Sequence, residues 1–324
     1  MRTIDVAALQ RSVSVLGFGC APLGSRVSPK DGRRALDLAF ERGVTWFDVA
    51  PSYGDGEAET LLGRFACGRR DELTICTKVG VAPPRMSLGH RLARPIMRSA
   101  LRAAPNLRPP PDVRSPAGWA WPAPSRHPIA PEAIEASLAG SLRRLRVDRV
   151  DVLLLHEPTP AEAADPRIWE TLRRLIGEGQ ARTCGVAGSA EAVIAAARPG
   201  APFTVAQVTD NPFQSEWSRI ARSCPDWLIV THSIFEGRRA LMRLESRLAA
   251  DPASRSRRQT EPPGEFGALT ASALLLDYAL ARNAKGVVLA TMFRPGHVEA
   301  NCARASAPVR SGALTAIDAL AGVA

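Results

Sequence analysis

Short apolar runs alternate along the chain with stretches in which apolar residues recur every three or four positions. Eight runs have the character of strands: 14–19, 45–50, 73–80, 150–157, 182–188, 203–209, 227–233 and 286–291. Helical periodicity lies between most of them, most clearly near 30–42, 57–66, 131–145, 161–178 and 268–283, and returns from about 296 and in a last helix over about 311–323. Strands made of nearly continuous apolar residues are typical of a parallel sheet that is buried on both faces.

Eight strand–helix units in one chain predict a closed (β/α)8 barrel, with residues 1–324 as a single domain. A doubly wound open sheet is the alternative architecture. It is disfavoured because no G-x-G-x-x-G follows the first strand; the glycines of "GFGCAPLG", from Gly17 to Gly24, have a different spacing.

Two segments interrupt this pattern. Residues 83–130 follow the third strand and, with Pro131, contain 12 prolines, so they cannot form one helix or a central strand. A long loop after a barrel strand rises from the face that carries active sites, which makes this insertion a candidate lid. Its Trp119 and Trp121 suit either a pocket wall or packing of the loop onto the barrel. The polar, proline-rich segment 251–265 predicts a flexible loop on the same face.

The net charge of +10 raises the possibility of a nucleic-acid partner. However, the chain has only three lysines (Lys30, Lys78 and Lys285), so 39 of its 42 basic residues are arginines, spread without a dense block. We therefore expect no nucleic-acid binding, although the charge suits an anionic ligand or a phosphate-bearing cofactor.

The six cysteines are scattered, with no C-x-x-C pair and no zinc-type spacing, which predicts reduced thiols and no metal site. No apolar run reaches the length of a membrane span, and the N-terminus lacks the apolar region of a signal peptide. These features predict a cytoplasmic protein without a membrane partner, and they leave the oligomeric state open.

Four chemically distinctive residues fall at the carboxyl ends of consecutive predicted strands. Asp48 ends the second strand, Tyr53 follows it in a Pro-Ser-Gly-Asp turn, Lys78 ends the third and His156 ends the fourth. Each alone fits an ordinary structural role, such as a cap, a loop residue or a surface cation. Because the carboxyl ends of barrel strands converge on one mouth, the coincidence of all four favours a functional site. A lysine in a chain that otherwise uses arginine adds weight, since the two are not interchangeable at a tight site.

This set of side chains suits the reduction of a carbonyl group. A phenol has a pKa of about 10 and is a poor proton donor at neutral pH, but a nearby ammonium brings that pKa closer to the working range. A carboxylate would hold the ammonium in place, and a histidine would orient the carbonyl oxygen. The set lacks a hydride source, so a nicotinamide cofactor is implied.

Three segments carry a resemblance to a known family. "GVTWFDVAPSYGDGEAETLLG", "CTKVG" and "SLRRLRVDRVDVLLLHEP" resemble the Asp/Tyr, lysine and histidine segments of the aldo-keto reductases. The weaker segments "GVAG", "AQVTDNPFQ" and "VLATMFRPGHVEAN" stand where the cofactor segments of that family would lie, so the resemblance runs from about residue 10 to 305 outside the insertion. It implies a (β/α)8 barrel that binds NADPH or NADH. It also implies Tyr53 as the general acid, Lys78 and Asp48 as its tuning pair, and His156 as the carbonyl-orienting residue.

The resemblance further implies a set of cofactor-binding residues: Gly19, Cys20, Gln207, His232, Ser233, Arg294 and Asn301. Some positions depart from the family pattern. Ala187 and Gly188 replace its Ser-Asn pair, and His232 stands where an aromatic residue usually stacks on the nicotinamide. Thr291 and Met292 stand where cationic and hydroxyl residues usually grip the 2′-phosphate. Arg294 is a substitute cation for that phosphate, so NADP is favoured and NAD stays possible.

The sequence thus predicts an NAD(P)H-dependent oxidoreductase that acts on an aldehyde, ketone or sugar carbonyl, or catalyses the reverse oxidation. The alternative is a cofactor-binding barrel that serves mainly as a sensor or interaction protein with little turnover. The weakened cofactor segments motivate this second hypothesis. Substrate identity and the physiological direction stay open.

Overall fold

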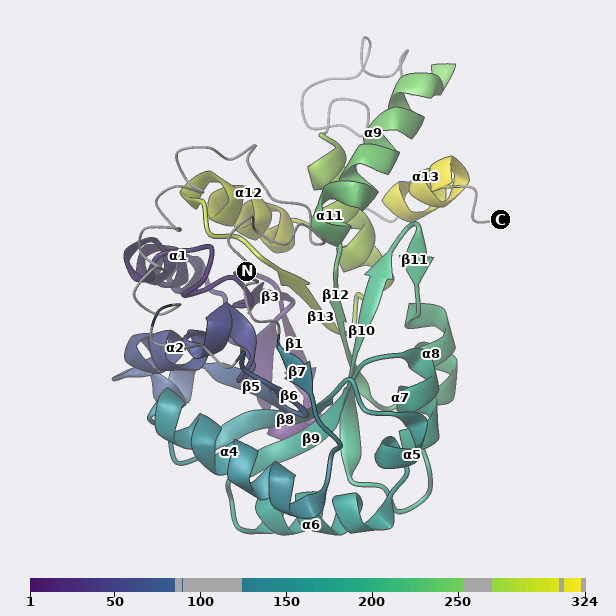
Figure 1. Ribbon diagram of the computed structural model, residues 1–324. Coiled ribbons are helices and arrows are strands. Elements are labelled where there is room, and N and C mark those ends of the chain that lie inside the picture. The colour runs from purple at the N-terminus through teal and green to yellow at the C-terminus, as the bar shows by residue number, and fades with distance from the viewer. Residues whose placement is uncertain (85–88, 90–123, 253–269, 309–311, 322–324) are drawn as a thin grey trace.

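The chain forms a closed barrel of parallel strands surrounded by helices (Figure 1). The computed structural model describes residues 1–84, 89, 124–252, 270–308 and 312–321. Within these residues the barrel has eight strands: β3 (Leu16–Gly19), β4 (Trp46–Asp48), β5 (Thr74–Val79), β8 (Val150–His156), β9 (Ala181–Ala187), β10 (Phe203–Asn211), β12 (Leu228–His232) and β13 (Val287–Ala290). Each pairs in parallel with the next along the chain, and pairing of β13 with β3 closes the ring. The predicted (β/α)8 barrel is confirmed.

A helix follows each barrel strand on the outside of the sheet. These helices are α1 (Pro29–Glu41), α2 (Ala58–Ala66), α4 (Pro131–Leu145), α6 (Pro166–Gly177), α7 (Ala190–Ala196), α8 (Trp217–Ser223), α11 (Ala271–Arg282) and α12 (Pro295–Ser306). Their starts follow local chemistry. Ser28, Ser189 and Thr270 accept hydrogen bonds from the first turns of α1, α7 and α11, and proline takes a first-turn position in α1, α4, α6 and α12.

The structure differs from the predicted helices at two places. The single helix expected over 161–178 is wrong, because it divides into a short α5 (Pro160–Ala163) and α6. Asp165 caps α6 and Pro166 takes its first position, which starts a new helix there. The sequence interpretation also missed α9 (Arg239–Ala250), which follows β12, whereas α13 (Gly312–Ala321) agrees with the helix expected near the end of the chain.

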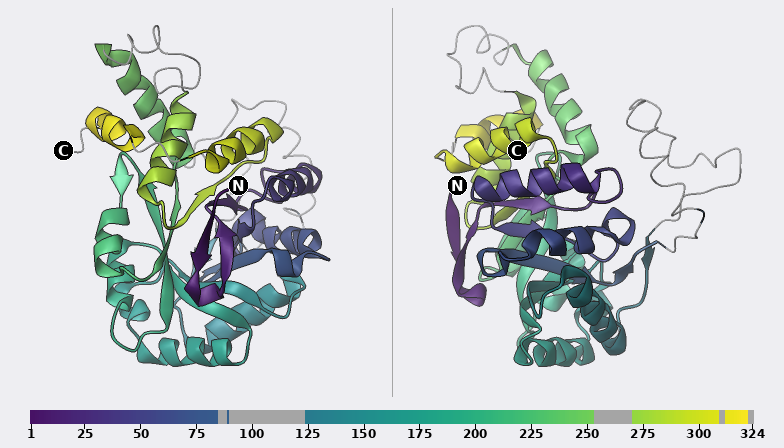
Figure 2. Two further views of the ribbon diagram at one scale, coloured as in Figure 1. Left: turned by 180° about the vertical axis from the view of Figure 1, so that it is seen from behind. Right: turned by 90° about the vertical axis from the view of Figure 1, so that its left-hand side faces the viewer.

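The barrel is filled and covered at the amino ends of its strands. An N-terminal hairpin, β1 (Thr3–Val6) and β2 (Arg11–Ser14), is joined by the 3-10 turn η1 (Ala7–Leu9). Val6, Leu9 and Val13 pack with the inward side chains of the barrel, including Trp46 and Leu154. Figure 2 shows this hairpin, in purple, across one end of the barrel. Burial of each such side chain contributes roughly 1.5–3 kcal/mol, which explains why the hairpin stays on that end.

Shorter elements frame the other end of the barrel. They are the pair β6 (Val81–Ala82) and β7 (Ser125–Arg126), the strand β11 (Gln214–Ser215), and the turns η2 (Tyr53–Gly56) and η4 (Glu236–Arg238). The turn η3 (Arg70–Glu72) instead precedes β5 and lies at the hairpin end, where Arg11 donates to the carbonyl of Asp71 at 2.9 Å. The antiparallel β6–β7 pair joins the two ends of the proline-rich insertion. Most of the candidate lid, including Trp119 and Trp121, and all but the first two residues of the 251–265 loop lie outside the described residues. Among the residues described, no helix has the length and apolarity to cross a membrane.

Candidate active site

The four residues singled out in the sequence meet at the carboxyl ends of the barrel strands, opposite the hairpin. Asp48 is the last residue of β4, Lys78 the penultimate residue of β5 and His156 the last of β8. The turn η2 then places Tyr53 beside them. Strand register aligns Asp48 with Cys76 and Lys78 with Leu154, so neighbouring strands lift these side chains to one mouth.

Lys78 and Asp48 form a buried ion pair. The Nζ atom of Lys78 donates to both carboxylate oxygens of Asp48, at 2.6 and 2.7 Å, and to the carbonyl oxygen of Val49 at 3.3 Å. The side chains are only 1% and 3% exposed. Burial, the largest single influence, disfavours the ammonium, but the charge and hydrogen bond of Asp48 together with Tyr53 and Cys76 exceed it and raise the pKa of Lys78 above its ordinary value. The lysine therefore stays charged at physiological pH.

The turn that carries Tyr53 is set by its neighbours. The Tyr53 amide donates to the carbonyl of Ala50 at 3.0 Å, and the Gly54 amide donates to the carbonyl of Ala21 at 2.9 Å. Gly54 has φ of 60°, and a Cβ added there would lie 1.7 Å from the carbonyl oxygen of Leu23. Only glycine fits so close to that backbone, so this residue fixes the turn that returns Tyr53 to the mouth.

Tyr53 lies against the charged lysine. The Nζ atom of Lys78 is 5.0 Å from the centroid of the Tyr53 ring. Burial raises the pKa of the Tyr53 phenol to about 12, although the Lys78 ammonium acts in the lowering direction. Lys78 thus acts on the phenol pKa in the direction that the sequence predicted, but the opposite effect of burial is larger. The phenol therefore holds its proton across the physiological range, and the ammonium stabilises the phenolate once that proton leaves.

His156 faces Tyr53 edge-on and is held neutral. The two ring centroids are 6.0 Å apart and the planes meet at 85°. Burial, the charge of Lys78 and the presence of His232 lower the pKa of His156 to about 3. Its Nδ1 atom is buried and has no hydrogen-bond partner among the residues that the structure describes. A neutral imidazole keeps one N–H donor and one acceptor, which suits an uncharged polar ligand such as a carbonyl.

A model of the Aldo/keto reductase family matches residues 15–236. This chain belongs to that family. Among its curated relatives, a D-threo-aldose 1-dehydrogenase from Pseudomonas sp is 30% identical over 189 residues, which are 56% of this chain and 51% of the relative. The aldo-keto reductase yakc [NADP(+)] of Schizosaccharomyces pombe is 26% identical over 220 residues, or 64% of this chain and 52% of the relative. The chain thus spans about half the length of the curated relatives that it matches.

Solved structures show the same fold over almost the whole chain. The aldo-keto reductase AKR11C1 from Bacillus halodurans, in its holo form, superposes with a TM-score of 0.69 at 21% identity and covers 100% of this chain and 96% of that one. An aldo-keto reductase from Klebsiella pneumoniae in complex with NADPH gives a TM-score of 0.68 at 19% identity, covering 99% and 95%. At this identity the comparison concerns the fold alone.

In this member of the family a second buried carboxylate supports β5, the strand that carries Lys78. Glu59 of α2 is 1% exposed and accepts hydrogen bonds from Thr77 Oγ1 at 2.6 Å and from Arg144 Nε at 2.7 Å. Thr77 precedes Lys78 and points to the opposite side of β5. Glu59 thereby ties β5 to α2 and α4. The sequence interpretation missed Glu59. The feature that could have revealed it is a carboxylate on the side of the helix that faces the barrel.

Three of the residues implied for cofactor binding lie in the middle of β10, beside Ala187 at the end of β9, and at the carboxyl end of β12. Gln207 is 3% exposed, and its Oε1 atom has no partner within the described part of the chain. At the end of β12 the Nδ1 atom of His232 lies 2.8 Å from Ser233 Oγ, and burial lowers the pKa of His232 to about 4. Gln207 therefore offers an unsatisfied acceptor, while His232 offers a neutral ring.

The other four implied residues are divided between β3 and α12. At the end of β3, Gly19 and Cys20 lie beside Asp48, whose carbonyl accepts from the Cys20 amide at 2.9 Å. The thiol of Cys20 is buried. Arg294 is exposed at the N-terminal cap of α12, and Asn301 donates to the sulfur of Met292 within 3.8 Å. No contact joins Arg294 or Asn301 to the four residues at the mouth in the part of the chain that is described.

The Ser-Asn pair of the family has no polar counterpart in this structure. Ala187 ends β9 and is buried, and a Cβ at Gly188 would make only ordinary contacts, 3.4 Å or longer, with Glu157 and Pro158. The backbone thus has space for a side chain that the sequence does not supply. Among the described residues, no group of three or more His, Cys, Asp and Glu side chains could hold a metal ion.

Proposed function

We propose that this chain is a nicotinamide-dependent oxidoreductase that reduces an aldehyde, ketone or sugar carbonyl, or catalyses the reverse oxidation. The observation that carries the proposal is the buried, charged Lys78–Asp48 pair against the ring of Tyr53, with neutral His156 opposite. A protonated phenol, a fixed positive charge and a neutral hydrogen-bonding ring are what a carbonyl oxygen needs as it becomes an alcohol.

Each residue then has a distinct task. His156 donates a hydrogen bond to the carbonyl oxygen and orients it toward Tyr53. The Tyr53 hydroxyl gives its proton to that oxygen, and Lys78 stabilises the phenolate that is left. Asp48 keeps Lys78 charged and in place. A bound nicotinamide would supply the hydride to the carbonyl carbon.

Residues around the mouth fit a nicotinamide cofactor. The unpartnered Oε1 atom of Gln207 is a buried acceptor, and the carboxamide group of a nicotinamide carries the matching N–H donors. We assign His232 and Ser233 to the same end of the cofactor, beside the backbone of Gly19 and Cys20.

NADP is the preferred form of the cofactor in this proposal. Arg294 is an exposed guanidinium at the start of α12, where a phosphate also meets the positive end of the helix. We assign Asn301, on the same helix, to the neighbouring part of the cofactor. The relative from Schizosaccharomyces pombe that is named for NADP(+) supports this choice.

Free sugars are the first substrates to examine. The Pseudomonas relative is named as an aldose 1-dehydrogenase, and an L-galactose dehydrogenase of Arabidopsis thaliana is 27% identical over 200 residues. Oxidation of aldoses with NADP+ and NAD+, monitored by nicotinamide absorbance, tests this substrate class. Reduction of small aldehydes in the same assay tests the broader one.

The decisive variant is Tyr53→Phe, which removes one hydroxyl and keeps the ring. We expect reduction to fall by about 10²–10⁴-fold, the usual contribution of a general acid, while the affinity for NADPH stays within about twofold. Tyr278→Phe is the matched control, because Tyr278 is the other tyrosine of the chain and its hydroxyl contacts Asp318, away from the mouth. A Tyr53→Phe protein with most of its activity would refute the assignment of the acid.

The second candidate function is a barrel that binds the cofactor with little turnover. Ala187 and Gly188 favour it, because neither supplies the polar contact that the family pattern has at this place. Tight binding of NADPH without turnover across aldoses, aldehydes and ketones would support this function. Absence of binding by either nicotinamide would exclude both.

A further inference from the structure

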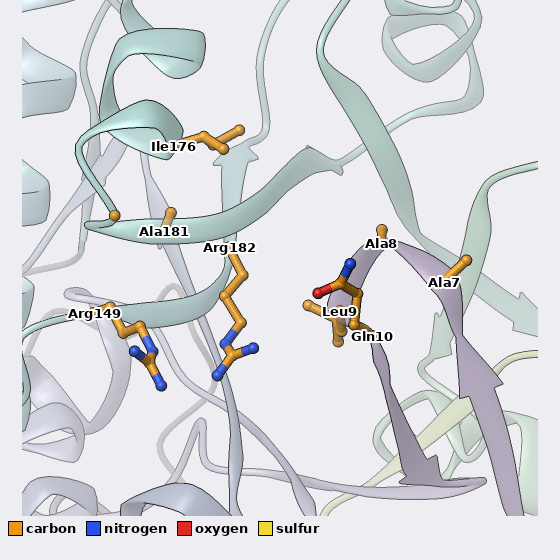
Figure 3. A pocket seen from close by; sticks show the side chains of 9 residues that line it. Ala7, Ala8, Leu9, Gln10, Arg149, Ile176, Ala181 and Arg182 are labelled. Carbon is orange, nitrogen blue, oxygen red and sulfur yellow. The ribbon is translucent and has the colours of Figure 1, made fainter.

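A pocket lined by two arginines lies at the amino ends of the barrel strands. It has a volume of about 470 Å³ and lies between the tip of the N-terminal hairpin and the starts of β8 and β9. Figure 3 shows Arg149 and Arg182 extending to the same side of these strands, with Leu9 and Gln10 nearby. The volume falls within the range of small-molecule sites.

Arg182 lies at ion-pair distance from a carboxylate that another arginine already neutralises. Asp151 is fully buried, and its Oδ2 atom accepts from the Ile75 amide at 2.8 Å and lies 2.9 Å from Nη1 of Arg70. The Nε atom of Arg182 lies 3.2 Å from the other oxygen, Oδ1. Oδ1 accepts no hydrogen bond within the described residues, so Arg182 meets Asp151 through charge alone and its outer nitrogen atoms remain for another partner.

Arg149 has little compensation of its charge. The carboxylate nearest to it within the described residues is that of Asp71, at 3.8 Å, and this side chain is 94% exposed. Such an exposed pair contributes almost nothing. The Nε atom of Arg149 is buried without a hydrogen-bond partner in the described part of the chain. Its backbone is fixed, since its carbonyl accepts from Arg70 Nη2 at 2.8 Å.

We propose that this pocket binds a small organic phosphate, with the phosphate group between Arg149 and Arg182. Two guanidinium groups that lack full compensation match the charge of a phosphate monoester, about −1.5 to −2 at neutral pH. The organic part lies along Ala7, Ala8 and Leu9 at the hairpin tip, because the pocket is larger than a phosphate alone.

The site is separate from the active site. β8 begins at Val150, next to Arg149, and ends at His156, and seven residues of strand span roughly 20 Å. A phosphate bound at the hairpin end therefore leaves the barrel mouth accessible. The proposal does not depend on the proposed oxidoreductase function.

Calorimetric titration of the full chain with glycerol 3-phosphate, AMP and inorganic phosphate tests the proposal. The titrations are made without nicotinamide nucleotide, because NADPH is itself an organic phosphate, and glycerol and adenosine are the uncharged controls. We expect both esters to bind more tightly than inorganic phosphate, the controls not to bind, and added salt to weaken binding. Arg149→Gln should weaken ester binding by about tenfold or more, as expected for loss of a charge-assisted contact.

Arg222→Gln on α8 is the matched control, because it removes the same charge from an exposed position outside the pocket. Arg182→Gln should also weaken binding, with circular dichroism to verify folding since Asp151 loses a partner. The proposal is overturned if no phosphate probe binds at millimolar concentration, or if Arg149→Gln binds as tightly as the unmodified chain. It is also overturned if Arg294→Gln, rather than Arg149→Gln, abolishes binding, because the ligand would then occupy the cofactor site. The comparison of Arg149→Gln with Arg294→Gln tests the pocket even if the chain binds no nicotinamide.

Discussion

Replacing Asp48 by asparagine isolates the charge of the buried carboxylate while nearly keeping its shape. The ammonium of Lys78 would then face a neutral amide, with the Val49 carbonyl as its other acceptor. Removing one partner from a fully buried ion pair costs about 3–5 kcal/mol, because the remaining charge stays desolvated. Native domains have roughly 5–15 kcal/mol of total stability, so we expect a folded but clearly weakened protein.

The pH dependence of this loss follows from the pKa of Lys78. In the unmodified chain the carboxylate raises the pKa of Lys78, so the pair stabilises the fold below the unfolded lysine value of about 10.4 and loses this effect as pH rises through the folded value. Without Asp48 the desolvation by burial, the largest single influence, is opposed only by Tyr53 and Cys76, and we expect it to lower the pKa of Lys78. The unfolded variant then binds more protons, and its free energy of unfolding rises with pH.

The measurement is urea unfolding of the two proteins, followed by far-UV circular dichroism at about pH 7 and about pH 10. We expect the difference in unfolding free energy to narrow at the higher pH. The double variant Asp48→Asn with Lys78→Met removes both charges, and it should be more stable than Asp48→Asn alone by about 2 kcal/mol. Activity should be lost in both variants, so stability and catalysis are scored separately.

The reasoning would be wrong if Asp48→Asn cost less than about 1 kcal/mol, the size of an exposed pair. A constant difference between the two pH values would also count against it, because Lys78 would then keep its proton without the carboxylate. Either result would mean that water or another group solvates the ammonium.

Three further predictions concern other parts of the barrel. Because burial lowers the pKa of His156 to about 3, the free energy of unfolding should fall as pH drops below the unfolded histidine value of about 6.5. Denaturant unfolding of His156→Gln over the same pH range should show a smaller fall in this free energy. Arg294→Gln should weaken NADPH binding by about tenfold in fluorescence titration and leave NADH binding unchanged, whereas equal weakening of both would disprove a phosphate contact. In thermal unfolding, Gly63→Ala should destabilise the fold by about 1–3 kcal/mol, because the new Cβ would lie 2.4 Å from the carbonyl oxygen of Leu145. Gly177→Ala is the control and should be neutral or stabilising, because a Cβ there would have no atom within 4 Å.

Much of the fold was predictable from local pattern. The eight apolar runs correspond to the eight barrel strands within one or two residues at most ends, and the helix predicted over 131–145 has the same bounds in the structure. The division at Pro166 was missed because the apolar period continues across it. The N-terminal hairpin was missed as well, since its three buried anchors become meaningful only against the barrel interior.

The candidate site was predictable because strand ends in a barrel have a fixed spatial meaning. Once the strands were assigned, Asp48, Lys78 and His156 had to face one mouth. Strand order alone does not place Tyr53, because its position depends on the turn that Gly54 permits against the backbone of Leu23.

The sequence by itself determined the architecture and the residue types at the mouth, since both follow from apolar periodicity and strand order. Only the tertiary structure decided the electrostatic state of the mouth. Burial, which no local pattern contains, outweighs Lys78 and raises the pKa of Tyr53, and it holds His156 neutral. The pocket between Arg149 and Arg182 likewise appears only on folding, because its charge excess depends on Asp151 being neutralised by Arg70 from a distant part of the chain.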